Sequence, residues 1–126
     1  MILFYNYIYK RDFMKAIEFC KIETTYIEDE VGEDIIKALL AQKLAACIQV
    51  HEIGSFYHWD GELNTSTEKL LVIKTTEERY ESVEAEILRY HNYETPEIIK
   101  IPITGGYQDY LDWVKEEVKT SDSCAI

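Results

Sequence analysis

The dipeptide Asp60-Gly61 most constrains what this chain can fold into, because it separates two unusually long stretches of strand-forming sequence. Asp-Gly between such stretches is the strongest short-range signal for a two-residue β-hairpin turn. The first stretch spans residues 46–59, with a bulge or bend predicted at Gly54, and the second spans Glu62–Thr75. Strands usually have about five or six residues, so a small domain cannot cover this whole hairpin. We expect its distal half, residues 56–67, to pair with another subunit.

Three helices and two further strands are predicted around the hairpin. The expected elements are a strand at Ala16–Thr25, a helix at Val31–Lys43, a helix presenting Tyr80, Val83, Ile87 and Tyr90 on one face, a strand at Glu97–Ile103 and a helix at Gln108–Lys119. Thr75 and Glu78 have the spacing of a capping box before the second helix. Pro102 cannot donate a hydrogen bond to a neighbouring strand, which favours an edge position for the last strand.

The order β-α-β-β-α-β-α predicts an α+β domain of the ferredoxin-like class. Right-handed crossovers place the first two helices on one face of a four-stranded antiparallel sheet. Apolar residues occur at both alternate positions of the first and third strands, which indicates that the other face is covered too. Oligomerisation is the simplest way to cover it, and the last helix is the alternative.

The chain has 126 residues, which suffices for one domain. We expect an N-terminal extension at residues 1–13, a single domain at 14–119 and a C-terminal tail at 120–126. In the extension the apolar residues precede Lys10-Arg11, the reverse of a secretory signal peptide, and Met14 is an alternative beginning. No apolar run approaches the roughly 18 residues that a membrane helix needs.

Composition narrows the classes of partner and compartment. The chain contains 13 Lys and Arg residues and 24 Asp and Glu residues, so its net charge is −11. This charge argues against a protein that binds nucleic acid through a basic surface. The three cysteines Cys20, Cys47 and Cys124 are widely spaced and contain no CxxC pair. A zinc ribbon and a disulfide scaffold are therefore not expected, and a reducing cytoplasm fits best.

Candidate chemistry is sparse. The sequence contains no GxSxG, HExxH or Walker-type motif, so no enzymatic activity is predicted. Imidazole and thiolate ligands suit copper or zinc, and His91 and Glu97 flank the loop before the last strand. Cys47 is a third candidate ligand. The alternative roles are a buried structural thiol for Cys47 and a cap of the second helix for His91.

Phe56, Tyr57 and Trp59 cluster beside the predicted turn. Exposed aromatic residues mark a protein interface more often than a platform for a sugar or nucleotide. These three residues are therefore candidates for a subunit interface or a ligand cleft.

Several ordered segments together resemble the CutA divalent-cation-tolerance family. They are KLAACIQV (43–50), SFYHWDGEL (55–63), EKLLVIKTT (68–76), HNYETPEIIKIPI (91–103) and GYQDYLDWV (106–114). The resemblance covers residues 16–119. It implies a ferredoxin-like homotrimer whose long hairpins pair between subunits, a role in tolerance of copper and other divalent cations, Cu(II) or another divalent cation as ligand, and no enzymatic activity.

The resemblance transfers the family's proposed copper site only in part. In bacterial members that site uses a cysteine at the end of the first strand and a histidine pair after the second helix. These positions fall on Thr24 and on Tyr90-His91, so the cysteine and one histidine are missing. Glu97 matches the family's TPE element. The resemblance therefore implies weak cation binding by His91 and Glu97, with Cys47 as an additional ligand.

The family trimer also resembles PII-type signalling proteins, which implies an alternative function. In it the chain is a sensor or scaffold that binds a small ligand or a partner protein in clefts between subunits. Lys74, Tyr93 and Trp59 are the candidate walls of such a cleft.

Overall fold

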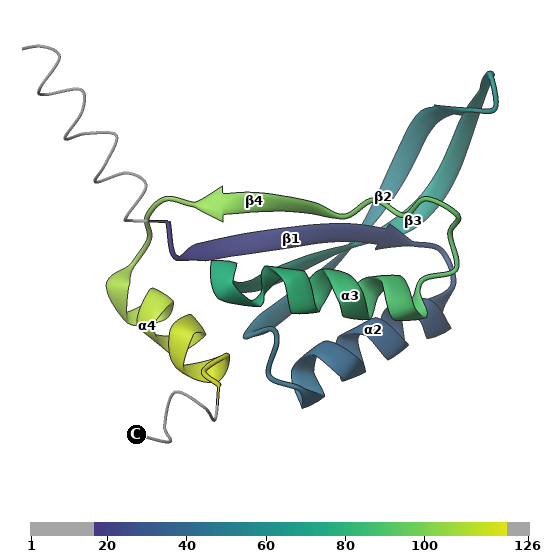
Figure 1. Cartoon of the computed structure of the whole chain (residues 1–126). Helices are drawn as coiled ribbons and strands as arrows, with labels where there is room; N and C mark the ends of the chain where they lie inside the picture. The colour runs from purple at the N-terminus through teal and green to yellow at the C-terminus, as the bar shows by residue number, and fades with distance from the viewer. Residues whose placement is uncertain (1–16, 121–126) are drawn as a thin grey trace, which may run out of the picture.

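The computed structural model describes residues 17–120, so the predicted extension at 1–13 and residues 121–126 of the tail lie outside the described residues. The described elements are β1 (Phe19–Tyr26), α2 (Asp29–Ala41), β2 (Cys47–Trp59), β3 (Glu62–Thr76), the short 3-10 helix η1 (Glu77–Arg79), α3 (Tyr80–Tyr90), β4 (Ile99–Ile103) and α4 (Gln108–Glu117). The strands form one antiparallel sheet in the order β2-β3-β1-β4. Helices α2 and α3 lie on one face of it, as predicted (Figure 1).

The main core lies between these two helices and the sheet. Alternate residues of the two central strands point into it and meet one face of each helix; the fully buried members are Cys20, Ile22, Ile35, Leu39, Leu71, Ile73, Val83 and Ile87. Complete burial of a large aliphatic side chain contributes about 1.5–3 kcal/mol. The core therefore fixes β1 and β3, the two strands on which the candidate site depends.

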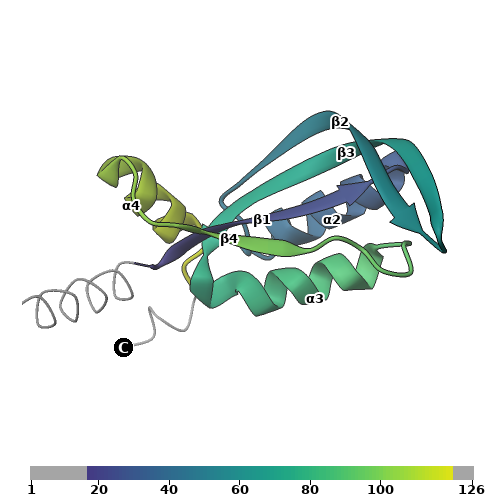
Figure 2. The same cartoon turned by 90° about the horizontal axis from the view of Figure 1, so that it is seen from above.

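Helix α4 covers part of the second sheet face, at the beginning of β1 (Figure 2). There Phe19, Leu111 and Val114 form a smaller buried cluster, against which Ala46 and Ile103 pack. Further along β4 the side chain of Ile99 is 45% exposed. The last helix thus covers one end of this face and leaves the other end uncovered in the single chain.

Strands β2 and β3 continue well beyond β1. Pairing between β1 and β3 ends at Tyr26↔Lys69, whereas pairing between β2 and β3 continues to Trp59↔Glu62. Residues 53–68, called the arm below, therefore have no third strand beside them among the described residues, and they project from the body of the domain (Figure 1).

The turn at the tip of the arm is the one predicted. Asp60 and Gly61 both have positive φ, 53° and 75°, the combination that a type I′ hairpin turn requires and that glycine adopts without strain. Of the bulge or bend predicted at Gly54, the bulge is wrong, because the two strands pair one residue to one from Cys47↔Lys74 to the tip.

The predicted capping box is also wrong. Thr75 follows Ile73 at the alternate position of β3, so its side chain points into the core, where its hydroxyl donates to the carbonyl of Leu44 at 2.7 Å. The residue that precedes η1 is Thr76, which makes no side-chain cap. The edge position predicted from Pro102 is confirmed, since β4 is the outermost strand beside β1.

No helix within residues 17–120 combines the length and the apolar character needed to cross a membrane.

Candidate functional site

A groove of about 610 Å³ lies where the arm leaves the sheet. Its walls come from the end of β1, from the arm and from the loop between α3 and β4. It gathers five of the predicted site residues, which are Phe56, Tyr57, Trp59, Tyr93 and Glu97. These residues lie far apart in the sequence, so the fold, and not local spacing, brings them together.

Glu68 is the groove residue that sequence reasoning missed. Its side chain is only 8% exposed, and the Tyr93 hydroxyl donates to Oε2 at 2.7 Å. Burial raises the pKa of Glu68, but hydrogen bonds from Ser55, Tyr93 and Thr25 outweigh this effect and bring the pKa below the ordinary 4.5. The groove therefore contains an ionised carboxylate at neutral pH.

His91 links the loop to the end of β1. Its Nδ1 accepts a hydrogen bond from the backbone N–H of Tyr93 at 3.1 Å, so Nε2 carries the proton and donates to the carbonyl of Thr25 at 2.7 Å. Pairing with β4 stops at Glu23↔Ile99, and the imidazole therefore satisfies a β1 carbonyl that lies beyond this pairing. The alternative role as a cap of α3 is not what the side chain does.

Glu97 lies on the rim of the groove. Burial, followed by the charges of Glu23 and Glu68, raises the pKa of its carboxyl group. None of the described residues that line the groove is Lys, Arg or His. The groove is thus a region of like negative charge, in which a bound cation would relieve repulsion.

The structure does not bring Cys47 to this groove. On β2, Cys47 precedes His51 by four residues. His51 and Thr25 both pair with Leu70 of β3, one from each side, so His51 marks the level of Thr25 in the sheet. At about 3.3 Å per residue, Cys47 lies roughly 13 Å along the sheet from the carbonyl that His91 binds. Among residues 17–120, no three His, Cys, Asp or Glu side chains are grouped so that they could hold a metal ion.

Lys74 also lies away from the groove. Its ammonium group is 5.6 Å from the centre of the Tyr110 ring on α4, at the opposite end of the sheet. Within a single chain it therefore does not share a wall with Tyr93 and Trp59.

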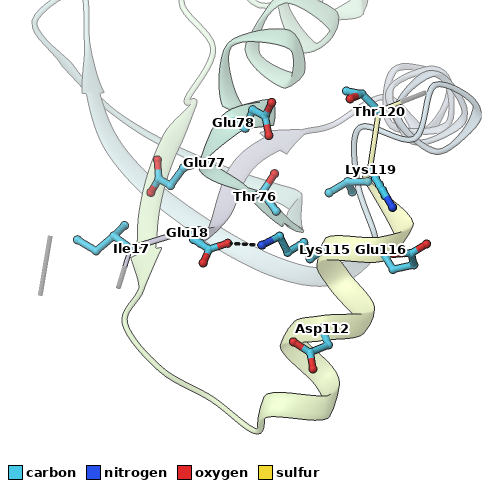
Figure 3. A pocket seen from close by; sticks show the side chains of 11 residues that line it. Ile17, Glu18, Thr76, Glu77, Glu78, Asp112, Lys115, Glu116, Lys119 and Thr120 are labelled. Atoms are coloured by element: carbon cyan, nitrogen blue, oxygen red, sulfur yellow. Dashed lines mark ion pairs between the residues drawn. The ribbon is translucent and has the colours of Figure 1, made fainter. Parts of the chain in front are cut away.

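A second hollow, also of about 610 Å³, lies between η1 and α4 (Figure 3). Carboxylates dominate its walls, but two of them are already paired with lysines. Glu18 lies 2.9 Å from Lys115, and Glu77 lies 2.6 Å from Lys100. This hollow gathers none of the predicted site residues, and the groove at the arm is the better candidate site.

Comparisons with known proteins agree with the fold. A family model described as CutA1 divalent ion tolerance protein matches residues 20–117. The chain belongs to this family. The Divalent-cation tolerance protein CutA of Archaeoglobus fulgidus is 41% identical over 90 residues, which cover 71% of this chain and 88% of the relative. The chloroplastic CutA protein of Arabidopsis thaliana is 34% identical over 106 residues, 83% of this chain and 58% of that longer relative.

Solved structures of CutA proteins share the fold. The solved structure of the periplasmic divalent cation tolerance protein CutA from Archaeoglobus fulgidus superposes on this chain with a TM-score of 0.77 and 39% sequence identity. The superposition covers 80% of this chain and 99% of the Archaeoglobus fulgidus chain. CutA1 from Oryza sativa gives a TM-score of 0.77 at 33% identity, with 83% and 97% covered. The family model and the Archaeoglobus fulgidus relative are named for divalent-ion tolerance and not for an enzymatic reaction.

Glu68 offers a test of the electrostatics of the groove. Since its pKa is lower in the folded chain than the ordinary 4.5, its ionised form stabilises the fold above that pH, and the contribution is lost as the pH falls through the folded-state pKa. We expect Glu68→Gln to lower the free energy of unfolding in urea by about 1.5 kcal/mol at pH 7, and by progressively less as the pH falls below about 4.5. The exposed control Glu62→Gln should match the parent over the whole range. A Glu68→Gln deficit that stays constant with pH would contradict this account.

Proposed function

We propose that this CutA-family chain acts in the response to divalent metal ions, without enzymatic activity, by binding divalent cations such as Cu(II) weakly. The observation that carries this proposal is the juxtaposition of Glu97 and Glu68 in a groove whose described lining contains no basic residue. His91 adjoins this lining, since it is hydrogen-bonded to Thr25 and Tyr93. Negative charge attracts a cation there, and imidazole and carboxylate are suitable ligands for copper and zinc.

The contacts of His91 explain why we propose weak binding. Both ring nitrogens are already used, one by Tyr93 and one by Thr25. A metal ion that binds either nitrogen must displace a hydrogen bond, and that displacement costs affinity. The separation of Cys47 from the groove removes the thiolate that would otherwise strengthen a copper site.

We expect calorimetric titration of the reduced protein with Cu(II) and Zn(II) to show saturable, weak binding that His91→Ala lowers roughly tenfold, the effect of losing a ligand contact of about 1.4 kcal/mol. The matched control is His58→Ala, which removes an exposed imidazole near the tip of the arm. Equal binding by all three proteins would show that the cations associate only with the general acidic surface. In that case the proposed metal role of His91 fails.

We further propose that the domain has the ferredoxin-like arrangement and functions as a homotrimer. The strand order and the placement of α2 and α3 support the first part. The arm supports the second, because Phe56 and Leu63 are 77% and 70% exposed on it. Its outer backbone edge also lacks a third strand among the described residues, and unpaired edges favour pairing with another chain.

A reducing compartment such as the cytoplasm is our proposal for the site of action. Cys20 and Cys47 are both free thiols, and burial together with Glu77 raises the pKa of the Cys20 thiol to about 11. A protonated, buried thiol is inert and is compatible with reducing surroundings.

The groove favours a second candidate function. A trimeric, PII-like sensor or scaffold would bind a small ligand or partner in clefts between subunits. The support for it is that Tyr57, Trp59 and Tyr93 line a common hollow next to the arm that we assign to assembly.

A further inference from the structure

We propose that the groove at the base of the arm binds a small organic cation, an ammonium or alkylated ammonium ion, between the Glu68 carboxylate and the rings of Tyr57, Trp59 and Tyr93. This proposal rests on the second candidate function and adds the chemical class of the ligand.

The first argument is that the residues lining the groove carry negative charge and include no basic side chain. Glu68 is 8% exposed, and three hydroxyl groups, from Ser55, Tyr93 and Thr25, hold its carboxylate ionised. Hydroxyl groups bind a carboxylate but do not cancel its charge. Glu94 and Glu97 add two further carboxylates to a lining that contains no Lys, Arg or His among the described residues. The lining therefore favours a cation and disfavours phosphates, nucleotides and other anions.

The second argument is the placement of the aromatic rings. Side chains alternate along a strand, so Ile53, Ser55, Tyr57 and Trp59 all point to one face of the arm. Glu68 pairs with Ile53 and therefore points to the same face. Both rings are partly exposed, at 41% and 45%. The Tyr93 ring is held in place by its hydroxyl, which donates to Glu68. Aromatic faces around a site bind organic cations by cation–π attraction, which is strongest for large, weakly hydrated ions.

The third argument is the number of ligand atoms that the groove offers. Tight binding of a divalent metal ion needs several donor atoms that converge on one point. Within residues 17–120 no three His, Cys, Asp or Glu side chains are so grouped, which agrees with the weak metal binding proposed above. One buried carboxylate beside aromatic rings is sufficient for an ion whose charge is spread over methyl groups or N–H bonds.

Two other apolar residues of the arm lie on its opposite face. Phe56 pairs with Thr65 and Leu63 pairs with His58, so Phe56 and Leu63 project from the face opposite Tyr57 and Trp59. Phe56 nevertheless also lines the groove. Contacts between subunits and contacts with a ligand can therefore use different faces of one arm.

The test is a proton NMR titration of the full chain with tetramethylammonium chloride, with tert-butanol as a neutral molecule of similar size and sodium chloride at matched ionic strength. We expect the tetramethylammonium methyl line to broaden and to shift upfield, as protons above aromatic rings do. Tert-butanol should show neither change. Glu68→Gln should weaken tetramethylammonium binding roughly tenfold, the effect of about 1.4 kcal/mol, whereas Glu62→Gln at the arm tip should bind like the parent.

Two further variants keep the test decisive if Glu68→Gln fails to fold. Tyr57→Leu and Trp59→Leu replace partly exposed side chains and should each weaken binding roughly threefold to tenfold. The proposal is overturned if the tetramethylammonium line does not respond, responds as tert-butanol does, or is unaffected by the variants. Amide resonances of residues 55–68 that respond only to neutral or anionic ligands would overturn the organic cation but keep the second candidate function. Amides that respond to no ligand would overturn both.

Discussion

Replacing Leu63 with Asp should lower the mass of the protein in solution about threefold, from that of the proposed trimer to that of the single 14.8 kDa chain. Leu63 is 70% exposed on the arm. If the arm lies between subunits, the substitution places a charge in an apolar contact, where a charge without a partner is strongly unfavourable. Light scattering at matched protein concentrations measures the change.

The matched control is Leu88→Asp, since Leu88 is a 54% exposed leucine of α3, outside the arm. It should leave the mass unchanged. A parent protein that already has the mass of one chain would refute the proposed trimer. A Leu63→Asp variant that keeps the parent mass would show that assembly does not use this face of the arm.

Replacing Gly32 with Ala should destabilise the fold by about 2 kcal/mol, although alanine favours a helix over glycine by about 1 kcal/mol. Gly32 is buried in the first turns of α2. A β-carbon there would overlap the ring of Tyr26 and lie 2.6 Å from its hydroxyl. The Tyr26 side chain is 4% exposed and has little room to move, and overpacking of this kind costs about 3 kcal/mol.

Urea unfolding of four proteins tests this explanation. These are the parent, Gly32→Ala, Tyr26→Leu and the double variant. In the Tyr26→Leu background the added methyl group has space, so Gly32→Ala should be neutral or slightly stabilising there. A single Gly32→Ala variant as stable as the parent would show that the ring yields at little cost.

Most of the fold follows from patterns that are local in the sequence. The helix predicted at Val31–Lys43 is observed at Asp29–Ala41, and the strand predicted at Glu62–Thr75 extends by one residue. Apolar periodicity and the Asp60-Gly61 turn carry this information. The two local errors, at Gly54 and Thr75, share one cause. In both, contacts that β3 makes with distant residues, Gly54 with Thr67 across the hairpin and Thr75 with Leu44, override the local preference.

The candidate site was less predictable, because it depends on contacts between distant segments. Tyr93 and Trp59 were identified by type and position, and the groove brings them together. Glu68 gave no signal as a site residue, since a single Glu at the edge of an apolar run reads as a solvated strand end. Its burial depends on Thr25, 43 positions earlier by the numbering, and on Tyr93, 25 positions later. The predictions for Cys47 and Lys74 rest on residue type, which says nothing about which end of the sheet a residue occupies.

The unbroken pairing of the arm also restricts how its length can vary among homologous chains. Removing one residue from each strand would keep the pairing but turn every side chain between the deletions and the tip to the opposite face. Leu63 would then point toward the groove and Tyr57 away from it. Only changes of two residues in each strand preserve both faces, and each such change moves the tip by about 7 Å. Arm lengths in related proteins should therefore differ in paired steps.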